Sequence, residues 1–245
     1  MTTRRLMVAL AICVSSVAVV ATGAEADIRF PDDDTTNSVA GVEAPLGHRL
    51  ATGDLNGDGY EDLVLGNWSD DVGAARRAGS VAVVYGGEDG LDWTDVDVIH
   101  QDTPGVGGGA EEDDSFGEAI AIGNFDGDCC DDLAVGTKRD DLESNTVRDA
   151  GWVQIFSGTP SGLDTDDFGF DQETPGGWPA ANEELDWFGD NLQTGDFDAD
   201  GYDDLAISVV FEDIGTGASA VEDAGAVVVV FGTASGIDIG EYQVI

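Results

Sequence analysis

The stretch that decides the fold is FGDNLQTGDFDADGYDDLAISV, residues 188–209. Two earlier stretches match it, LGHRLATGDLNGDGYEDLVLGN at residues 46–67 and FGEAIAIGNFDGDCCDDLAVGT at residues 116–137. Their leading glycines, Gly47, Gly117 and Gly189, lie 70 and 72 residues apart. Self-similarity at a nearly fixed period is the signature of a repeat architecture. We therefore predict that the chain contains three copies of one unit.

The similarity extends beyond these stretches to both ends of the chain. Each copy continues with a second matching segment, AGSVAVVYGG from Ala78, AGWVQIFSG from Ala150 and AGAVVVVFG from Ala224, and then a Gly-containing turn. The segments near Val96 and Phe168 also match each other, and EYQVI, with which the sequence closes, occupies the corresponding place in the third copy. The predicted organisation has a leading strand and then three repeats, at residues 27–45, 46–115, 116–187 and 188–245.

Each repeat is predicted to form four short strands. The apolar segments are short, rich in β-branched and aromatic residues, and separated by Gly, Asp and Pro turns, with no sustained helical period. A small sheet of four strands cannot bury both faces alone, and stacking such sheets around an axis solves this problem. The predicted fold is all-β, with three β-propeller-type blades of four antiparallel strands.

Three blades are fewer than a closed ring needs, since propellers typically have about 4–8. The first and last blades would each leave an apolar face open. Three arrangements remain open: the chain is part of a longer or split product, copies self-associate to complete a ring, or loops cap the ends. The leading strand at 27–45 could complete the last blade only if the ring closes.

A carboxylate loop inside each repeat carries the chemistry. Oxygen-bearing side chains occupy loop positions 1, 3, 5 and 9, and the backbone carbonyl at position 7 is expected to point inward. Calcium takes six to eight oxygen ligands at about 2.3–2.6 Å, which oxygens alternating along a curled loop can supply. The predicted Ca²⁺ ligands are Asp54, Asn56, Asp58, Tyr60 and Asp62 in copy one, Asn124, Asp126, Asp128, Cys130 and Asp132 in copy two, and Asp196, Asp198, Asp200, Tyr202 and Asp204 in copy three.

Chance alone is a poor explanation of these loops. In a chain with 51 acidic residues some alternating Asp arises by accident, but accident does not place one pattern at the same phase of three repeats. The loop is not of the helix-loop-helix type, because position 12 is Leu65, Val135 or Ile207 where that type needs Glu. The predicted loop therefore joins two strands.

The three loops are not expected to bind equally. Copy three has four carboxylates and Gly201 at the turn, so it is predicted to bind most tightly. In copy two Cys129 replaces the turn glycine, and a non-glycine residue at positive φ costs about 1–2 kcal/mol. This site is predicted to be the weakest or distorted. For the adjacent Cys129 and Cys130, a vicinal disulfide, free thiols and intermolecular pairing all remain open.

These residues resemble the FG-GAP repeat family, the repeats of the integrin α-subunit β-propeller. The stretches FGEAIAIGNFDGD and FGDNLQTGDFDADGYDDLAIS contain the Phe-Gly start, the loop and the following strand. The resemblance implies a β-propeller, calcium as the metal, and adhesion or ligand recognition outside the cell. This chain departs from the family in three ways: Leu46 replaces the first Phe, the Gly-Ala-Pro element is barely recognisable, and there are three repeats where integrin-type propellers have seven.

Residues 1–26 are predicted to be an export signal. Arg4 and Arg5 precede a mostly apolar run, and Ala24-Glu25-Ala26 is a cleavage cue. The segment Thr3–Val8 also resembles a twin-arginine export signal. No second long apolar stretch follows, so the mature chain is expected to be secreted or at the cell surface, without a membrane span.

The charge balance excludes some partners. With 51 acidic against 9 basic residues, the formal net charge is −42. Nucleic-acid binding needs a basic face, so no nucleic-acid partner is expected. The calcium loops use only a minority of the acids, and the remaining excess resembles the proteins of haloarchaea, in which concentrated salt screens self-repulsion.

No catalytic constellation stands out. The two histidines, His48 and His100, have no fixed nucleophile in sequence, and neither a nucleophile elbow nor a phosphate loop occurs. The first hypothesis is a secreted, non-catalytic, calcium-binding module that recognises an extracellular protein or glycan. The alternative is an accessory or ring-completing part of an extracellular hydrolase or polysaccharide-binding system.

Overall fold

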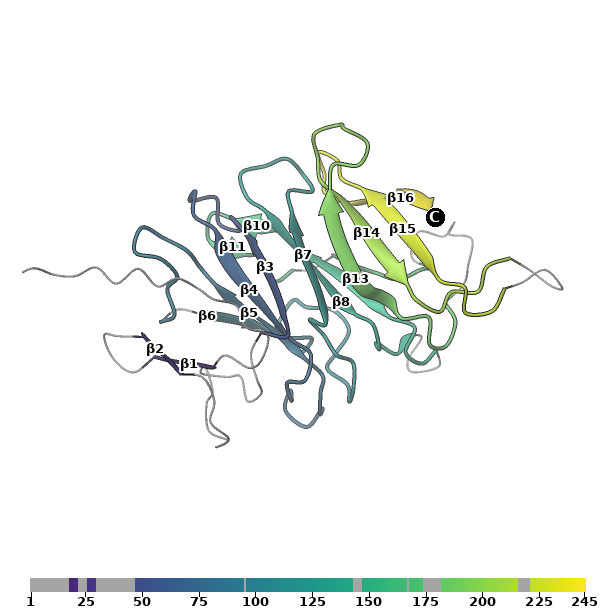
Figure 1. Ribbon diagram of the computed structural model, residues 1–245, viewed down its shortest axis with the longest axis horizontal. Helices are drawn as coiled ribbons and strands as arrows, with labels where there is room; N and C mark the ends of the chain where they lie inside the picture. Colours follow the sequence, from purple (N-terminus) through teal and green to yellow (C-terminus); the bar gives the residue numbers. More distant parts are fainter. Residues whose placement is uncertain are drawn as a thin grey trace, which may run out of the picture.

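The computed structural model describes residues 18–21, 26–29, 47–94, 96–142, 147–166, 168–173, 182–215 and 221–245. Three four-stranded antiparallel sheets account for most of these residues, and Figure 1 shows them side by side in chain order. We call them blades one, two and three. Blade one contains β3 (Arg49–Gly53), β4 (Asp62–Asn67), β5 (Ser80–Val84) and β6 (Val96–Ile99).

The other two blades repeat this order. Blade two contains β7 (Ala119–Gly123), β8 (Asp132–Thr137), β9 (Trp152–Phe156) and β12 (Phe168–Phe170). Blade three contains β13 (Phe188–Gly195), β14 (Asp204–Val209), β15 (Ala226–Phe231) and β16 (Asp238–Val244). The prediction of an all-β fold with four antiparallel strands in each repeat is confirmed.

Two small pairs lie outside the blades. β10 (Gly158–Thr159) and β11 (Gly162–Leu163) form a hairpin inside repeat two. β1 (Ala18–Ala21) pairs with β2 (Ala26–Arg29), and Figure 1 shows this pair beyond blade one. The start of the predicted leading strand therefore pairs with β1 in this structure and not with β16. The rest of that segment, and most of the predicted export signal, lies outside the described residues.

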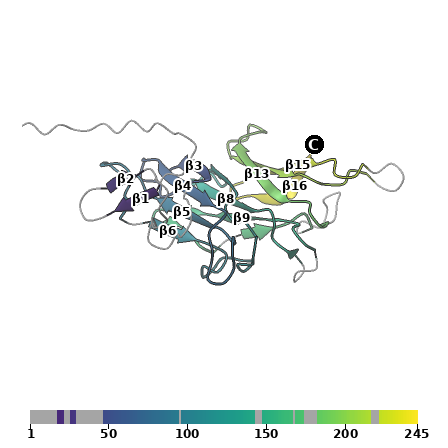
Figure 2. The same ribbon diagram turned by 60° about the horizontal axis from the view of Figure 1, so that its bottom comes forward.

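The blades are held together by apolar side chains from facing sheets. Between blades one and two, Val64, Val81 and Val83 pack with Leu133, Val135 and Phe156. Between blades two and three the equivalent set forms the largest cluster, and Figure 2 shows the two sheets in successive layers. Blade two therefore buries one face against blade one and the other against blade three. This arrangement explains why β8 is buried along its whole length. On β5, Ala82 and Val84 are covered on their side by residues of the same repeat, among them Leu91, Trp93 and Val98.

The chain's lone lysine lies at the junction of blades two and three. Lys138 directly follows β8, and its Nζ lies 3.0 Å from a carboxylate oxygen of Glu118 and 2.7 Å from one of Asp190. The same ammonium group lies 4.7 Å from the ring centroid of Trp187, a cation–π distance. Because Glu118 belongs to the second repeat and Asp190 to the third, this cation adds a polar contact to the apolar junction.

Candidate metal centre

Each carboxylate loop connects the first two strands of its blade. The loops follow β3, β7 and β13, and each is closed by a glycine paired with the aspartate at position 9: Gly53 with Asp62, Gly123 with Asp132, and Gly195 with Asp204. The predicted placement between two strands is therefore observed in all three repeats. Since the blades share one orientation, the three loops lie at the same end of their sheets.

Loop three brings carboxylates together most closely. Ligand atoms of Asp196, Asp198 and Asp204 all lie within 4.8 Å of one another. Two oxygens on opposite sides of a calcium ion would be separated by about 4.6–5.2 Å, twice the usual Ca–O distance. The three carboxylates therefore fit a single calcium ion. Loop one has Asn56 at position 3, so it offers fewer charges.

Loops one and three share one hydrogen-bonding pattern. The position 1 carboxylate accepts the backbone N–H groups of positions 5 and 6, at 3.0 and 2.8 Å for Asp54 and at 3.1 and 3.2 Å for Asp196. These bonds curl the chain around the carboxylate. The turn glycines Gly59 and Gly201 have φ of 89° and 101°, the left-handed conformation predicted for them.

Loop two follows a different path, as predicted. Asn124 Oδ1 accepts the N–H of Gly127 at 2.7 Å, and its amide donates to the Asp128 carbonyl at 3.3 Å. Cys129 is not among the residues with positive φ, so the turn at position 6 is not left-handed here. A left-handed residue at position 4 occurs in all three loops, a feature that the sequence analysis missed: Gly57, Gly127 and Ala199. Weaker metal binding at loop two stays a prediction.

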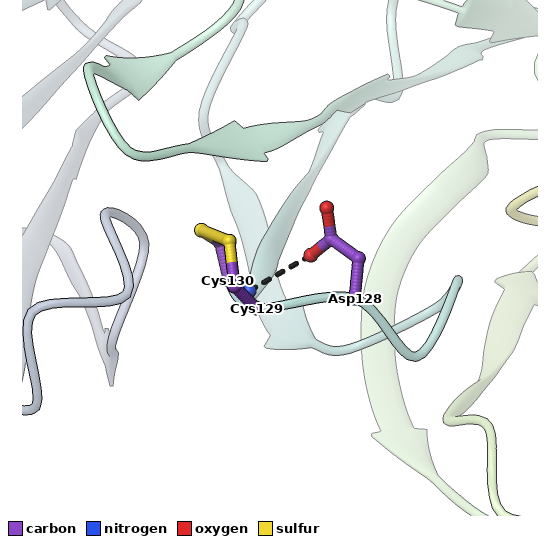
Figure 3. Close-up of side chains that lie close together, drawn as sticks. All are labelled: Asp128, Cys129 and Cys130. Carbon is purple, nitrogen blue, oxygen red and sulfur yellow. Dashed lines mark hydrogen bonds between the residues drawn. A yellow bond between two sulfur atoms is a disulfide. The ribbon is translucent and has the colours of Figure 1, made fainter.

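The adjacent cysteines form a disulfide in this structure. Figure 3 shows the Cys129–Cys130 bond beside Asp128, whose Oδ1 accepts the backbone N–H of Cys130 at 2.8 Å. Of the three alternatives left open by the sequence, the structure thus has the vicinal disulfide. Metals bind cysteine as the thiolate, so these sulfurs are not suitable ligands. Loop two could offer a cation only oxygen atoms.

The aspartate at position 9 is buried and joins three strands. Its Oδ2 accepts the N–H of loop position 2, and its Oδ1 accepts the N–H of the glycine that follows the third strand of the blade. We call this arrangement the position 9 clasp. Burial raises the pKa of Asp132 to about 6, although the backbone hydrogen bonds from Gly158 and Phe125 lower it in part. A bound cation would favour the ionised form in the same place.

The residues that form the clasps are Asp62 with Leu55 and Gly86 in blade one, Asp132 with Phe125 and Gly158 in blade two, and Asp204 with Phe197 and Gly232 in blade three.

Position 8 links each loop to the preceding blade. In blade two, Asp131 Oδ2 accepts the N–H of Asp54 at 2.9 Å, and the Asp131 N–H donates to the Asp54 carbonyl at 2.9 Å. In blade three, Asp203 makes the same pair of bonds to Asn124, at 2.9 and 3.0 Å. We call this pair of bonds the position 8 latch. Consecutive loops are therefore fixed to one another. The sequence indicates these bonds only through the acid that recurs at position 8.

A second class of buried acid lies at the opposite end of the sheets. Asp140 follows β8, is almost fully buried and accepts a 2.6 Å hydrogen bond from Gln101. Burial, and then the negative charge of Asp114, raises the pKa of Asp140 to about 8. Burial also raises the pKa of Asp114 to about 7. Gln172 of repeat two and Glu212 of repeat three repeat the hydrogen bond, at 2.6 Å.

The Asp140 site makes stability depend on pH. The folded-state pKa lies above the unfolded value of about 3.9, so its contribution to stability is complete below about pH 4 and is lost as pH rises to about 8. Asp140→Asn should therefore raise Tm at pH 8 and change it little at pH 5, because asparagine can still accept the Gln101 bond without a buried charge. Thermal melts across this pH range measure the effect. Asp89→Asn, which removes an exposed charge, is the control; equal gains in both variants would contradict the assignment.

Comparison with known proteins supports the resemblance seen in the repeats. The sequence model of the FG-GAP repeat family matches residues 46–84, which contain loop one and strands β3 to β5. The matched stretch covers part of the first repeat. The equivalent strands and loops of blades two and three show that the FG-GAP repeat here forms one propeller blade, and that the chain contains three such blades.

Several curated proteins are similar to this chain. Phosphatidylinositol-glycan-specific phospholipase D of Rattus norvegicus is 31% identical over 168 residues, 69% of this chain and 19% of that protein. Integrin alpha-6 of Homo sapiens is 31% identical over 128 residues, 51% of this chain and 10% of that protein. Integrin alpha-5 of Xenopus laevis is 30% identical over 168 residues, 66% of this chain and 14% of that protein. The matched region spans less than a fifth of each of these relatives.

Within the described residues, no helix is long and apolar enough to cross a bilayer.

Proposed function

We propose that the chain is an exported, calcium-stabilised FG-GAP propeller module that recognises an extracellular protein or glycan and has no catalytic activity of its own. The observation that carries the proposal is loop three, where three carboxylates from one hairpin converge within 4.8 Å. Similarity to integrin alpha chains over half or more of this chain supports a module of the same kind.

In this proposal calcium stabilises the blades. The loop residues would bind the ion through Asp196, Asp198 and Asp204, with loop one offering Asp54, Asp58 and Asp62. Bound calcium would neutralise carboxylates that now lie close together, and would hold each hairpin in the conformation that the position 8 latch needs. The ligand-binding surface would then be formed by loops on one rim, whose chemistry does not name the partner.

A calcium titration followed by thermal melting tests the proposal. A site filled at 100-fold excess over its Kd stabilises the fold by about 2.7 kcal/mol, and 1 kcal/mol shifts Tm by about 2–4 °C in a domain of this size. We therefore expect calcium to raise Tm by about 5–10 °C for each occupied site relative to chelator, with magnesium much less effective. The melts belong in concentrated salt, because the net charge of −42 should destabilise the chain at low ionic strength.

A ligand variant makes this test specific. Asp198→Asn removes one negative ligand but keeps an oxygen that can accept the N–H of Asp200, now bonded to Asp198 at 3.0 Å. It should reduce the calcium-induced rise in Tm and leave the melt in chelator unchanged. Asp89→Asn is a matched control on an exposed turn. An identical calcium response in wild type, Asp198→Asn and control would refute loop three as a calcium site.

The similarity to a phospholipase D favours a second candidate. That match covers 69% of this chain, so the module could instead accompany a hydrolase, as an accessory or ring-completing part. Turnover assays on phosphoester and glycan substrates separate the candidates. The first predicts no turnover by the purified chain, whereas hydrolysis that survives repeated purification would favour the second.

A further inference from the structure

Loop two differs from the other two loops at positions 6 and 7. Loops one and three have Gly-Tyr there, at residues 59–60 and 201–202, whereas loop two has Cys129 and Cys130. The oxygen-bearing side chains at positions 1, 3, 5 and 9 are retained in loop two. Two sulfur atoms have therefore been added to a loop that still has the side chains of a cation site, at the place where the other loops make their left-handed turn.

The two sulfurs lie beside one carboxylate of the loop. Ligand atoms of Asp128, Cys129 and Cys130 all lie within 4.8 Å of one another, and Figure 3 shows the carboxylate and the sulfurs on the same side of the loop. Two ligand atoms of one zinc ion are separated by at most about 4.6 Å, because Zn–S bonds are about 2.3 Å long and Zn–O bonds about 2.0–2.2 Å. The three side chains therefore lie at about the spacing that a single ion needs.

Backbone hydrogen bonds distinguish this carboxylate from its neighbour at position 3. Asp128 Oδ1 accepts the N–H of Cys130 at 2.8 Å, which holds the carboxylate next to the cysteine pair. Asp126 Oδ1 instead accepts the N–H of Asp128 at 2.9 Å. Among the residues that the structure describes, no further carboxylate belongs to the group formed by Asp128 and the two cysteines. Asp128 is therefore the oxygen ligand that the geometry offers to an ion bound by the sulfurs.

The two cysteines have unequal surroundings. Cys130 is 1% exposed, and its sulfur lies against loop one, where a Cβ on Gly57 would be 2.9 Å from it. At the next junction the ring of Tyr202 lies against Gly127 in the same way, so Cys130 has the packing role that tyrosine has at position 7 of loop three. Cys129 is exposed. One sulfur is thus anchored between two blades, while the other can be reached by a reductant or a metal ion.

We propose that loop two, once its disulfide is reduced, binds one thiophilic divalent ion such as Zn²⁺ or Cd²⁺ through the sulfurs of Cys129 and Cys130 and the carboxylate of Asp128. Two molecules of a small thiol supply the two electrons and two protons that convert the disulfide into two thiols, and leave as their own disulfide. The ion then replaces both thiol protons, which pass to solvent. The fourth position of its tetrahedron stays open to water, because Asp128 and Cys129 are exposed.

The oxidation state of loop two then decides which class of ion it binds. With the disulfide closed, the loop offers only oxygen atoms, and these suit hard cations such as calcium. With two thiolates, softer ions are favoured. Loops one and three contain no cysteine, so their preference for hard cations does not change on reduction. This inference goes beyond the proposed function and does not depend on calcium binding at loop three.

A cadmium titration of the full chain tests the proposal. The chain is reduced with a small thiol, freed of it by gel filtration without oxygen, and titrated with Cd²⁺ while excess calcium fills the oxygen loops. The ultraviolet charge-transfer absorption of cadmium–thiolate bonds should rise until one ion is bound per chain, and the cysteines should then resist alkylation. The oxidised chain should show no such absorption. Light scattering should give the same mass for the reduced chain before and after the ion is added.

Four variants make the titration specific. Cys129→Ser removes one sulfur, and Asp128→Asn removes the negative ligand but keeps an oxygen for the N–H of Cys130. Each should weaken cadmium binding by at least the roughly 10–100-fold that the loss of an outer partner costs at a metal site. Asp126→Asn, in the same loop, and Cys13→Ser, in the predicted export signal, are the matched controls and should bind as the unchanged chain does. Circular dichroism of the reduced variants shows that each is folded.

Several results would overturn the proposal. A folded, reduced chain without the charge-transfer absorption would do so, and so would full affinity in Cys129→Ser or Asp128→Asn. One ion shared between two chains, or an equal loss of affinity in Asp126→Asn and Asp128→Asn, would also contradict the assigned ligands. Calcium-dependent melting is measured separately, so a negative result here leaves the proposed function standing.

Discussion

Replacing Asp204 by alanine is expected to destabilise the protein by roughly 2–6 kcal/mol, even in chelator. Its Oδ2 accepts the N–H of Phe197 at 2.7 Å, its Oδ1 accepts the N–H of Gly232 at 2.9 Å, and the Asp204 side chain is fully buried. Alanine leaves the buried N–H of Gly232 and the partly buried N–H of Phe197 without an acceptor, and an unsatisfied buried donor costs about 1–3 kcal/mol. Thermal or denaturant unfolding in chelator and concentrated salt measures the loss.

The effect separates the position 9 clasp from metal binding. Asp200→Ala is the matched control, because Asp200 lies in the same loop but is exposed, and its Oδ1 accepts one N–H, that of Tyr202 at 3.0 Å. In chelator it should cost far less than Asp204→Ala; in calcium both variants should lose stability. If the two variants unfolded alike in chelator, the clasp would not be a structural element in its own right.

The second large effect is expected at the junction of blades two and three. A Cβ on Gly136 would lie 2.2 Å from the carbonyl oxygen of Gly189. This oxygen is a backbone atom, so no change of side-chain rotamer can relieve the overlap. Gly136→Ala should therefore force the blades apart and cost about 3 kcal/mol or more, the upper end of the range for overpacked interiors. Gly136 does not have positive φ, so the loss would report the close approach and not backbone strain.

Gly87→Ala is the control for this substitution. Gly87 also lacks positive φ, and the nearest atom to its added Cβ is 3.9 Å away. Where alanine fits, it usually stabilises by about 0.4–1 kcal/mol through the unfolded chain. Unfolding in denaturant should thus move in opposite directions for the two variants. An unchanged midpoint for Gly136→Ala would show that the blades can separate without loss.

Much of this architecture could be predicted from local sequence. The phase of the three FG-GAP-type stretches predicted the number of blades, and the short apolar runs after Asp62, Asp132 and Asp204 predicted the second strands. The left-handed turns at Gly59 and Gly201 followed from residue type alone. Cys129 in loop two predicts a site that is the weakest or distorted; its backbone does not adopt the positive φ of the turn glycines, and weaker binding there stays a prediction.

Contacts between repeats could not be predicted in this way. Nothing in the sequence says that Asp131 bonds to the backbone of Asp54, or Asp203 to that of Asn124, since the partners lie 77 and 79 residues apart. The raised pKa of Asp140 likewise depends on burial and on Asp114, which come together only in the folded chain. The excess of acids predicts adaptation to concentrated salt, but several of the acids outside the loops are buried.

The chain by itself determined its three blades, their strands and the loops that offer oxygen to a cation, because turn chemistry and short apolar runs act over a few neighbouring positions. Only the tertiary structure decided which loop draws its carboxylates together and which aspartates join strands or blades. Those properties depend on distances between segments about 70 residues apart, and such distances exist only after the sheets have stacked.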